Sequence, residues 1–282
     1  MNALNHVWRS AFWQVGERLR RRQLLGAGVL MGALPWHMAW GAGDPTEGDP
    51  LGSTQWPDIQ RAFVGAGPVR FSGQVSVKGP AFADDALNVP VMVDARALAS
   101  AGAAVARIRV VVDRNPIRHV LDYEPLLSLP VLAFRLRLEQ ASPVRALVQT
   151  QDGRWHAGGT WVQAAGGGCT VPGATRADGS WSQTLNQVQA RFFSSVLEGS
   201  RRLRVRIMHP MDTGLVAGIP AFHLEQLELL DATDRPCWRL VLHEPVSENP
   251  LITFELPRQL TGHFRLVGRD NNGNRIDAAV PA

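Results

Sequence analysis

Residues Gly166, Gly167, Gly168 and Cys169 place a thiol at the end of a run of glycines. Glycine lacks a Cβ and samples both signs of φ, so such a run is costly to order and usually stays mobile. A thiolate is a nucleophile that can accept sulfur from a donor and pass it on. A mobile thiol of this kind suggests that the protein is a carrier, with Cys169 exposed to solvent on a flexible arm.

Two other interpretations of the same residues stay open. The Gly-rich run could be an interdomain linker in which the cysteine is incidental. The chain has only two cysteines, and a disulfide between Cys169 and Cys237 would close a large loop in an oxidising compartment. Cys237 lies between Pro236 and Trp238 at the start of an apolar strand, where a small buried side chain is expected.

Other residue types that could do chemistry are sparse. Met208, His209 and Met211 offer soft ligands for copper, but their spacing at a strand end does not bring three ligands together, and core packing is favoured. No Ser, His and Asp set lies on a recognisable nucleophile elbow, and no phosphate-binding loop is visible. We therefore expect a protein that is not an enzyme, with no catalytic residues, no metal and no cofactor.

The N-terminal residues 1–42 have the layout of an export signal. Arg21 and Arg22 are followed by Leu24 and Leu25 and then by an apolar, Gly/Ala-rich stretch, which is typical of a twin-arginine signal. The general secretory route is the alternative. Glycines and a proline interrupt the apolar stretch, which disfavours a lasting membrane anchor. We expect cleavage near Ala42, a periplasmic location, and no membrane attachment of the mature form.

The charge balance disfavours nucleic acid as a partner. The chain has 29 Lys plus Arg and 25 Asp plus Glu, but residues 1–42 hold five arginines and one acid. Removing them leaves 24 of each sign. A chain without net positive charge has little with which to release counterions from phosphates.

The elements that must position Cys169 are predicted to be strands. The residues after the signal suffice for two domains, at 55–163 and 183–282, joined by a Gly-rich arm and linker at 164–182. Alternating apolar and β-branched residues favour strands in both parts. In the first part these strands are at 69–77, 89–93, 105–113, 132–138, 144–150 and 155–162. In the second they are at 203–208, 222–230, 238–242, 252–256 and 263–269.

Turn residues complete the pattern. Residues 151–153 and 270–274 are predicted hairpin turns, whereas 94–104 is equally compatible with a short helix or a loop. Residues 185–197 have the spacing of one helix face, although a strand from Phe192 is the alternative. Short strands with tight connections indicate an all-β fold of two immunoglobulin-like antiparallel β-sandwiches.

Four stretches of the second part resemble SoxZ, a subunit of the bacterial sulfur-oxidation carrier complex, in the same order along the chain. They are His209-Pro-Met-Asp-Thr-Gly-Leu215, Ile219-Pro-Ala-Phe-His223, Val246-Ser-Glu-Asn-Pro250 and Asp270-Asn-Asn-Gly273.

The first part resembles SoxY, through Asp113-Arg-Asn-Pro116 and the Gly-Gly-Gly-Cys run. In that family the cysteine bears sulfur intermediates covalently and presents them to partner enzymes. The order of the two parts is similar to fused SoxYZ-like carriers associated with quinoprotein dehydrogenases. In SoxY the cysteine lies near the end of its chain, whereas more than a hundred residues follow Cys169 here, so this arm is tethered at both ends.

The resemblance implies a periplasmic covalent carrier whose attachment atom is the sulfur of Cys169, with Gly166, Gly167 and Gly168 as the hinge of its arm. Its partners would be sulfur-oxidation or quinoprotein dehydrogenase enzymes, with the SoxY-like and SoxZ-like parts packed on one another in the same chain. The alternative function is a non-catalytic binding or adaptor module of two sandwiches, in which both cysteines are structural.

Overall fold

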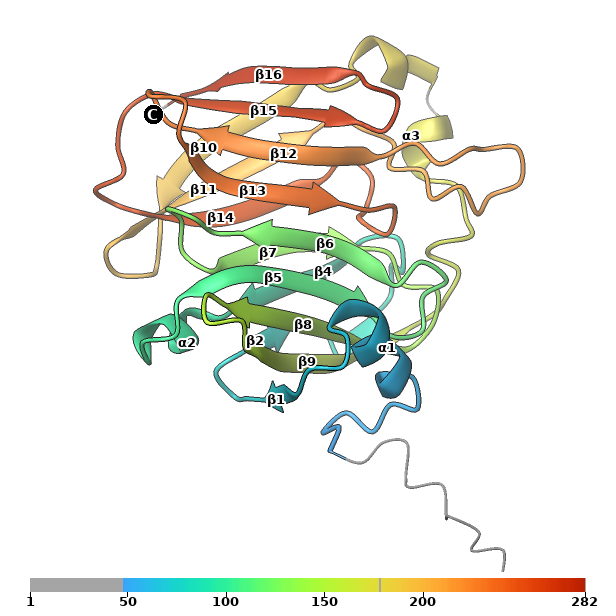
Figure 1. Ribbon diagram of the computed structural model, residues 1–282. Coiled ribbons are helices and arrows are strands. Elements are labelled where there is room, and N and C mark those ends of the chain that lie inside the picture. Colours follow the sequence, from blue (N-terminus) through green and yellow to red (C-terminus); the bar gives the residue numbers. More distant parts are fainter. Residues whose placement is uncertain (1–47, 178, 282) are drawn as a thin grey trace, which may run out of the picture. The chain divides into compact units, whose positions relative to one another are not determined.

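Strands dominate the computed structural model, which describes residues 48–177 and 179–281 (Figure 1). The first half contains β1 (Val69–Phe71), β2 (Ser76–Lys78), β3 (Phe82–Ala83), β4 (Val89–Asp94), β5 (Val105–Val112), β6 (His119–Glu124), β7 (Val131–Leu136), β8 (Ser142–Thr150) and β9 (Trp155–Ala164). The second half contains β10 (Val188–Ser194), β11 (Ser200–Ile207), β12 (Leu224–Leu230), β13 (Pro236–Leu242), β14 (Leu251–Pro257), β15 (Phe264–Asp270) and β16 (Arg275–Val280).

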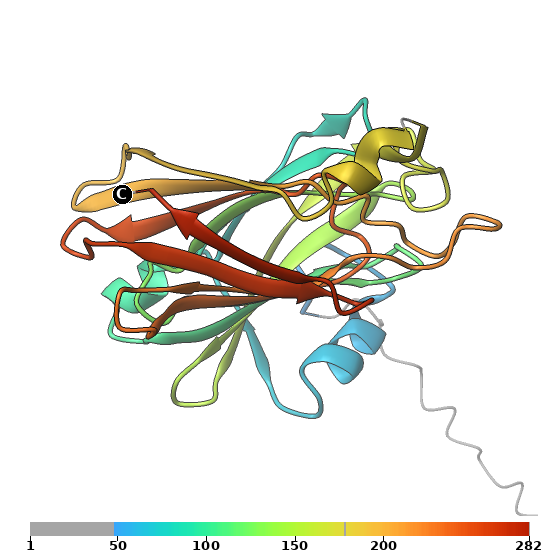
Figure 2. The same ribbon diagram turned by 90° about the horizontal axis from the view of Figure 1, so that it is seen from above.

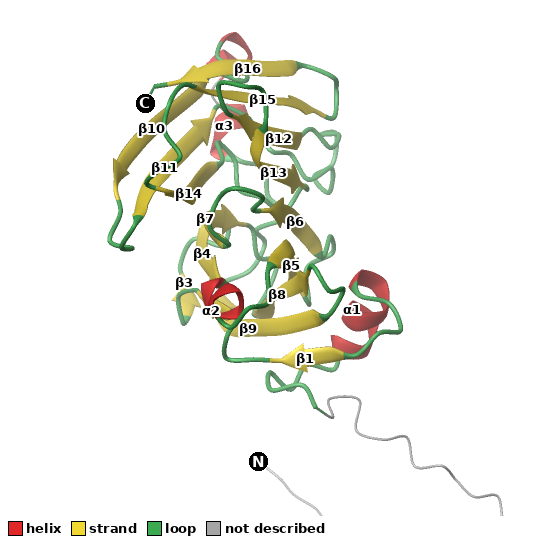
Figure 3. Ribbon diagram, turned by 60° about the vertical axis from the view of Figure 1, so that its left-hand side comes forward, coloured by secondary structure: helices red, strands yellow, loops and turns green. Residues whose placement is uncertain are grey.

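Helices are few and lie at the margins of the sheets (Figure 3). They are α1 (Trp56–Phe63), α2 (Arg96–Ser100), α3 (Ala174–Ala177) and the 3₁₀ helix η1 (Gly179–Gln183). None of the helices in the described ranges is long and apolar enough to cross a membrane. The expected export signal lies outside the described residues. The all-β prediction is confirmed.

Two sheets pack face to face, and each runs through both halves of the chain. One has the strand order β1-β9-β8-β5-β6-β13-β12-β15-β16, with β3 also paired to β9, and the other has the order β10-β11-β14-β7-β4-β2. The halves meet where β6 pairs with β13 and where β7 pairs with β14. Figure 2 shows the two layers from above, with the short helices of residues 174–183 at one end.

Each half contributes strands to both layers, so the two predicted sandwiches are present and join edge to edge through β6–β13 and β7–β14. The described residues belong to a single compact unit. Edge strands carry unpaired N–H and C=O groups, and the pairing of β6 and β7 with strands of the second half satisfies them. Alternation in a sequence identifies the two faces of a strand and not the neighbour at its edge. The division at residues 164–182 stays a prediction about domain organisation.

Side-chain alternation places one core between the sheets. In β4, Val89, Val91 and Val93 are buried, whereas Pro90 and Met92 point away from the core. One buried cluster extends through both halves. Near the junction of the halves, Trp238 stacks on Phe254 with ring centroids 4.1 Å apart. Phe254 also packs across the junction against Tyr123 of β6, with ring centroids 5.7 Å apart, and burial of this aromatic pair stabilises the halves against separation.

Several elements differ from the sequence predictions. Strand β6 was not predicted, because its charged residues resemble a loop. In the structure Arg107 binds Glu124 and Arg109 binds Asp122 across neighbouring strands, which satisfies those charges. Residues 188–194 form strand β10 and not a helix face, and α2 settles the open choice at 94–104. Both predicted hairpin turns are confirmed, and β16 follows the second.

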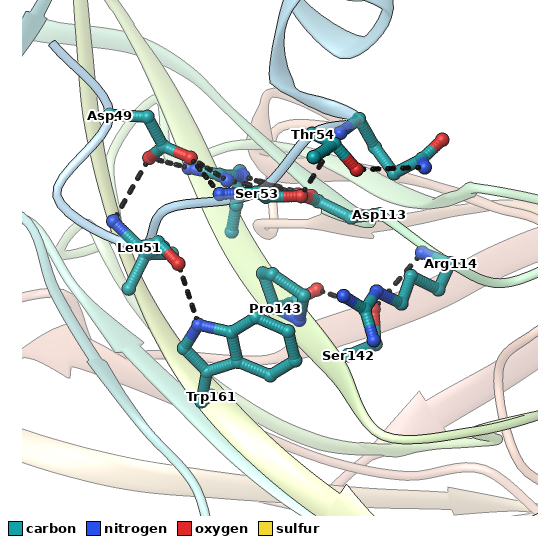
Figure 4. A network of polar contacts seen from close by, with 11 residues as sticks. Asp49, Leu51, Ser53, Thr54, Asp113, Arg114, Ser142, Pro143 and Trp161 are labelled. Atoms are coloured by element: carbon teal, nitrogen blue, oxygen red, sulfur yellow. Dashed lines mark hydrogen bonds and ion pairs between the residues drawn. The ribbon is translucent and has the colours of Figure 1, made fainter. Parts of the chain in front are cut away.

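A buried ion network fastens the N-terminal segment to the large sheet (Figure 4). Arg145 donates to Asp49 from Nη1 at 2.8 Å and Nη2 at 2.7 Å, and from Nε to Asp113 at 2.8 Å. Beside this network, Trp161 Nε1 donates to the carbonyl oxygen of Leu51 at 2.8 Å. Because Arg145 and both carboxylates are buried, each charge depends on the others for its solvation.

Candidate functional site

Cys169 is the candidate attachment residue, and its side chain is buried. The residue is 1% exposed, and its sulfur lies 4.0 Å from the carbonyl oxygen of Arg137. The expectation that a mobile glycine run holds this thiol in solvent is therefore wrong for this conformation.

The glycines before Cys169 are packed and hydrogen-bonded. Gly167 N donates to the carbonyl oxygen of Glu139, and Gly168 N to that of Leu138, both at 3.0 Å. Gly166 and Gly167 have φ of +101° and +77°, which other residues rarely adopt. A Cβ on Gly168 would lie 2.3 Å from the carbonyl oxygen of Ala86. Close approach and left-handed backbone thus require glycine here, and their role as a hinge stays a prediction.

The carboxylate of Glu139 holds the backbone and side chain that follow these glycines. Its Oε2 accepts from Cys169 N at 3.0 Å, and its Oε1 accepts from Thr170 Oγ1 at 2.9 Å. Charge-assisted bonds of this kind are stronger than neutral ones. We call residues 166–176 the cysteine segment. Glu139 binds this segment at residues 169 and 170, and we call this carboxylate the clasp.

The Asp113-Arg-Asn-Pro116 motif positions residues 137–139, which follow β7 and against which the cysteine segment packs. Asn115 Nδ2 donates to the carbonyl oxygen of Arg137 at 2.8 Å, and Asn115 Oδ1 accepts from Glu139 N at 2.9 Å. Asp113 is fixed by its ion pair with Arg145. The sequence singled out this motif, but only the structure shows that it supports Cys169.

The second half of the chain covers the other side of the cysteine segment. Thr213 Oγ1 donates to the carbonyl oxygen of Cys169 at 2.7 Å, and Arg137 Nη2 donates to that of Met211 at 3.3 Å. Further along the segment, Arg176 Nε donates to Asp212 at 2.8 Å. The stretch from His209 to Thr213 thus contacts the residue predicted to carry chemistry, which spacing along the chain could not show.

Arg137 is a buried cation next to the cysteine segment. Its guanidinium donates to the carbonyl oxygen of Gly168 at 3.3 Å, it is 1% exposed, and its Nε has no hydrogen-bond partner. No ion pair to a described carboxylate satisfies it. Burial lowers the pKa of Arg137. An arginine so short of partners marks this end of the sandwich as a functional candidate.

The environment of Cys169 suppresses its reactivity in this conformation. Burial raises the pKa of the thiol to about 12, the Glu139 carboxylate adds to this, and Arg137 opposes it. The thiolate is the nucleophile, so the closed thiol is nearly inert at neutral pH. Any chemistry at Cys169 therefore requires the segment to open.

Cys237 lies on strand β13 and is fully buried. Both cysteines are free, so the disulfide interpretation does not apply to this structure. Burial raises the pKa of the Cys237 thiol to about 11. The prediction that Cys237 is a small buried side chain is confirmed.

His209 and Met211, which the sequence offered as copper ligands, accept hydrogen bonds from backbone N–H groups. His209 Nδ1 accepts from Met211 N at 3.1 Å, and Met211 Sδ accepts from Leu224 N at 3.3 Å. In the part of the chain that the structure describes, no group of three His, Cys, Asp or Glu residues could hold a metal ion. His209 also packs against the ring of Phe222, with centroids 4.4 Å apart.

Two histidines, the buried His209 and the partly buried His243, predict a loss of stability on mild acidification. Burial lowers the pKa of His209 to about 4, partly offset by Asp270, and burial together with His119 lowers that of His243 to about 4. Unfolded histidines titrate near 6.5, so the unfolded chain binds more protons between pH 6.5 and 4. The free energy of unfolding should therefore fall by about 1.4 kcal/mol per pH unit for each histidine in that window.

Urea denaturation at intervals from pH 7 to 4.5 measures this effect. His243→Gln should remove about half of the dependence, because one of the two neutral imidazoles is then absent. A stability that stays constant over this range would show that neither histidine is held neutral by the fold.

A comparison with family models and a comparison with solved structures each found a match to SoxY. Residues 60–169 match the family model of the sulfur oxidation protein SoxY, and the match ends at Cys169. One similar solved structure is the sulfur carrier protein SoxY from Chlorobium limicola f thiosulfatophilum. It is 20% identical, the match covers 39% of this chain and 91% of that chain, and the TM-score is 0.33. A comparison with curated proteins gave no match. The predicted SoxY-like part is therefore confirmed for residues 60–169.

Proposed function

We propose that this protein is a covalent sulfur carrier in the periplasm, with Cys169 as the attachment residue. The observation that supports this most strongly is the SoxY match over residues 60–169, which ends on that cysteine. The carrier presents its sulfur by opening the segment around Cys169 and shelters it by closing.

We propose that this opening is local, and the contacts of the segment support this. Cys169 lies outside the strands, in a segment held by the bonds from Gly167, Gly168 and Cys169 N, by Glu139 and by Thr213. Such a segment can open without disturbing the sheets, whereas exposure of Cys237 requires strand β13 to separate from its neighbours. The two thiols are equally buried but differ in what must break to release them.

Loading follows the chemistry of thiol and disulfide exchange. The Cys169 thiolate attacks an inner sulfur of tetrathionate, the central S–S bond breaks, and thiosulfate leaves with the bonding electron pair. The product is a cysteine S-thiosulfonate, and the thiol proton goes to solvent. Arg137, whose guanidinium donates to the carbonyl oxygens of Gly168 and Met211 and lies in the field of Glu248, supplies a positive charge beside such an adduct.

The test is loading of the purified protein with tetrathionate, followed by intact-mass and peptide-mass measurement. We expect one S2O3 adduct on Cys169, retained in Cys237→Ser and lost in Cys169→Ser. Equal loading of Cys169→Ser and the unaltered protein, or no loading at all while the fold is intact, would contradict the proposal.

Loss of the Glu139 carboxylate is expected to make the Cys169 thiol more reactive. Glu139→Gln should raise the alkylation rate of Cys169 by iodoacetamide roughly fivefold, because it weakens bonds to the segment by about 1 kcal/mol and removes a charge that raises the thiol pKa. Glu198→Gln is the matched control, since Glu198 is exposed and far along the chain in the β10–β11 turn. Equal rates in both variants would exclude Glu139 as the clasp.

The second half is proposed to be SoxZ-like. Its support is the sequence of the four stretches quoted above, together with the contacts that His209 to Thr213 make with the cysteine segment. Residues 1–42 are proposed to be the export signal, and a quinoprotein dehydrogenase is proposed as one partner. Cell fractionation of the full chain and of an Arg21→Lys/Arg22→Lys variant tests the export proposal.

The adaptor alternative draws its support from the burial of both thiols. It predicts that neither cysteine takes up sulfur from tetrathionate while the protein stays folded. The loading experiment therefore separates the two functions.

A further inference from the structure

The outer face of the six-stranded sheet carries arginines without ion-pair partners, although the guanidinium of Arg204 lies over the ring of Phe193, 5.3 Å from its centroid. Arg135 on β7, Arg191 on β10, and Arg204 and Arg206 on β11 are exposed and make no ion pair with a described residue. The strand registers place them on one side, since Arg191 is opposite Arg204 and Thr253 links the β11 and β7 rows. We call these four residues the arginine face.

On the other sheet, most of the strand arginines form ion pairs. Every arginine of β5, β13 and β15 binds a carboxylate: the pairs are Arg107–Glu124, Arg109–Asp122, Arg239–Glu228, Arg265–Asp277 and Arg269–Glu225. On the six-stranded sheet the one comparable pair is Arg202–Glu255. Arg70 on β1 and Arg275 on β16 of the larger sheet also make no ion pair with a described residue, so the contrast with the six-stranded sheet holds for the central strands β5, β13 and β15.

The positive charges of the arginine face repel one another. Arg191 and Arg204 are direct cross-strand partners, and like charges in that position destabilise a sheet. Arg204 and Arg206 lie two residues apart on the same side of β11. A negative surface laid against this face would relieve the repulsion, so charge complementarity identifies an acidic occupant.

The face also has the apolar grooves of a protein-binding surface. Two open grooves, of about 400 and about 510 Å³, share Arg204 and Leu251 in their lining. Met92 lines the first groove, and Phe193, 42% exposed, lines the second. Arginine, methionine and aromatic side chains are enriched at protein interfaces, whereas a chain with balanced charge is poorly suited to nucleic acid.

The arginine face ends at the edge of the cysteine segment. Arg135 is opposite Pro90, close after Ala86, whose carbonyl oxygen would meet a Cβ on Gly168. Two residues beyond Arg135, the carbonyl oxygen of Arg137 contacts the thiol. A partner seated on the face would therefore have its reactive group next to the place where Cys169 emerges.

We propose that the arginine face docks an acidic patch of a partner protein and, on the proposed carrier function, sets that partner beside Cys169. The occupant is a folded protein surface rich in Asp and Glu, which enters the grooves with apolar side chains between its carboxylates.

A fluorescently labelled poly-glutamate peptide is the probe for the charge of this face, and fluorescence anisotropy is the readout. We expect Arg191→Ser/Arg204→Thr/Arg206→Ser to weaken binding roughly tenfold or more at low salt, because three cationic contacts are lost. The matched control, Arg107→Thr/Arg239→Thr/Arg269→Thr, removes the same charge from the other sheet and should bind as the unaltered protein does. The face variant should also melt no lower than the unaltered protein, since it removes repulsion.

Three results would overturn the docking proposal. They are equal weakening by both variants, no weakening by the face variant, and tighter binding of duplex DNA or of phosphatidylglycerol vesicles than of the peptide through the same arginines. Cys169→Ser should bind the peptide with unchanged affinity, so failure of sulfur loading and failure of docking are separate outcomes.

Discussion

Gly168→Ala will raise the alkylation rate of Cys169 by roughly 10- to 100-fold. The added Cβ meets the carbonyl oxygens of Ala86 at 2.3 Å and Leu138 at 2.6 Å, and both are backbone atoms that cannot swing aside. Overpacking of this kind destabilises the closed conformation of the segment by about 1–3 kcal/mol relative to the open one. The open fraction rises accordingly, and the alkylation rate follows it.

The measurement is iodoacetamide labelling followed by peptide mass, with circular dichroism to confirm that the sheets persist. Gly67→Ala is the control, because a Cβ there meets no atom within 4 Å. If Gly168→Ala labels at the rate of the control, the closed packing at Ala86 does not govern access to the thiol.

Asp49→Ala will lower the free energy of unfolding by about 3–5 kcal/mol. The substitution leaves the buried Arg145 guanidinium with Asp113 as its single carboxylate partner, and it removes the acceptor for Ser53 N. Most of the loss is the penalty of a buried charge that has lost a partner. The loss should appear in the urea midpoint at pH 7.

Asp58→Ala is the comparison for this prediction. Asp58 also pairs with an arginine, Arg61, but both side chains are more than half exposed, so its removal should change stability by less than about 1 kcal/mol. Similar losses in the two variants would mean that burial of the Arg145 network contributes little.

Much of the strand pattern could be predicted because alternation reports which side chains face a core. Strands β4, β8 and β14 lie close to their predicted ranges. Helix α1 was not predicted, because its 8 residues are shorter than the stretch over which a helical pattern can be recognised in a sequence. Its Trp56 and Ile59 are buried against Leu147 on the large sheet, a contact between residues about ninety apart in sequence.

The sequence identified Cys169 as the candidate residue, but it did not predict that the thiol is buried. A glycine run before a cysteine suggests mobility, because sequence carries no information on what the backbone packs against. The contacts of Gly168 with Ala86 and of Thr213 with Cys169 join segments distant along the chain. The arginine face could not be predicted for the same reason. Its residues come from three strands, and only the register of the sheet brings them onto one surface.

The urea dependence of alkylation at the two cysteines tests the central claim, that Cys169 becomes accessible by a local opening while the sheets stay folded. Rates are measured at urea concentrations below the unfolding transition and resolved by peptide mass. We predict that Cys169 reacts faster than Cys237 and that its rate rises little with urea, because a local opening exposes little surface. If both cysteines react at one rate, with the urea dependence of global unfolding, the thiol is released only by unfolding and cannot serve as a carrier.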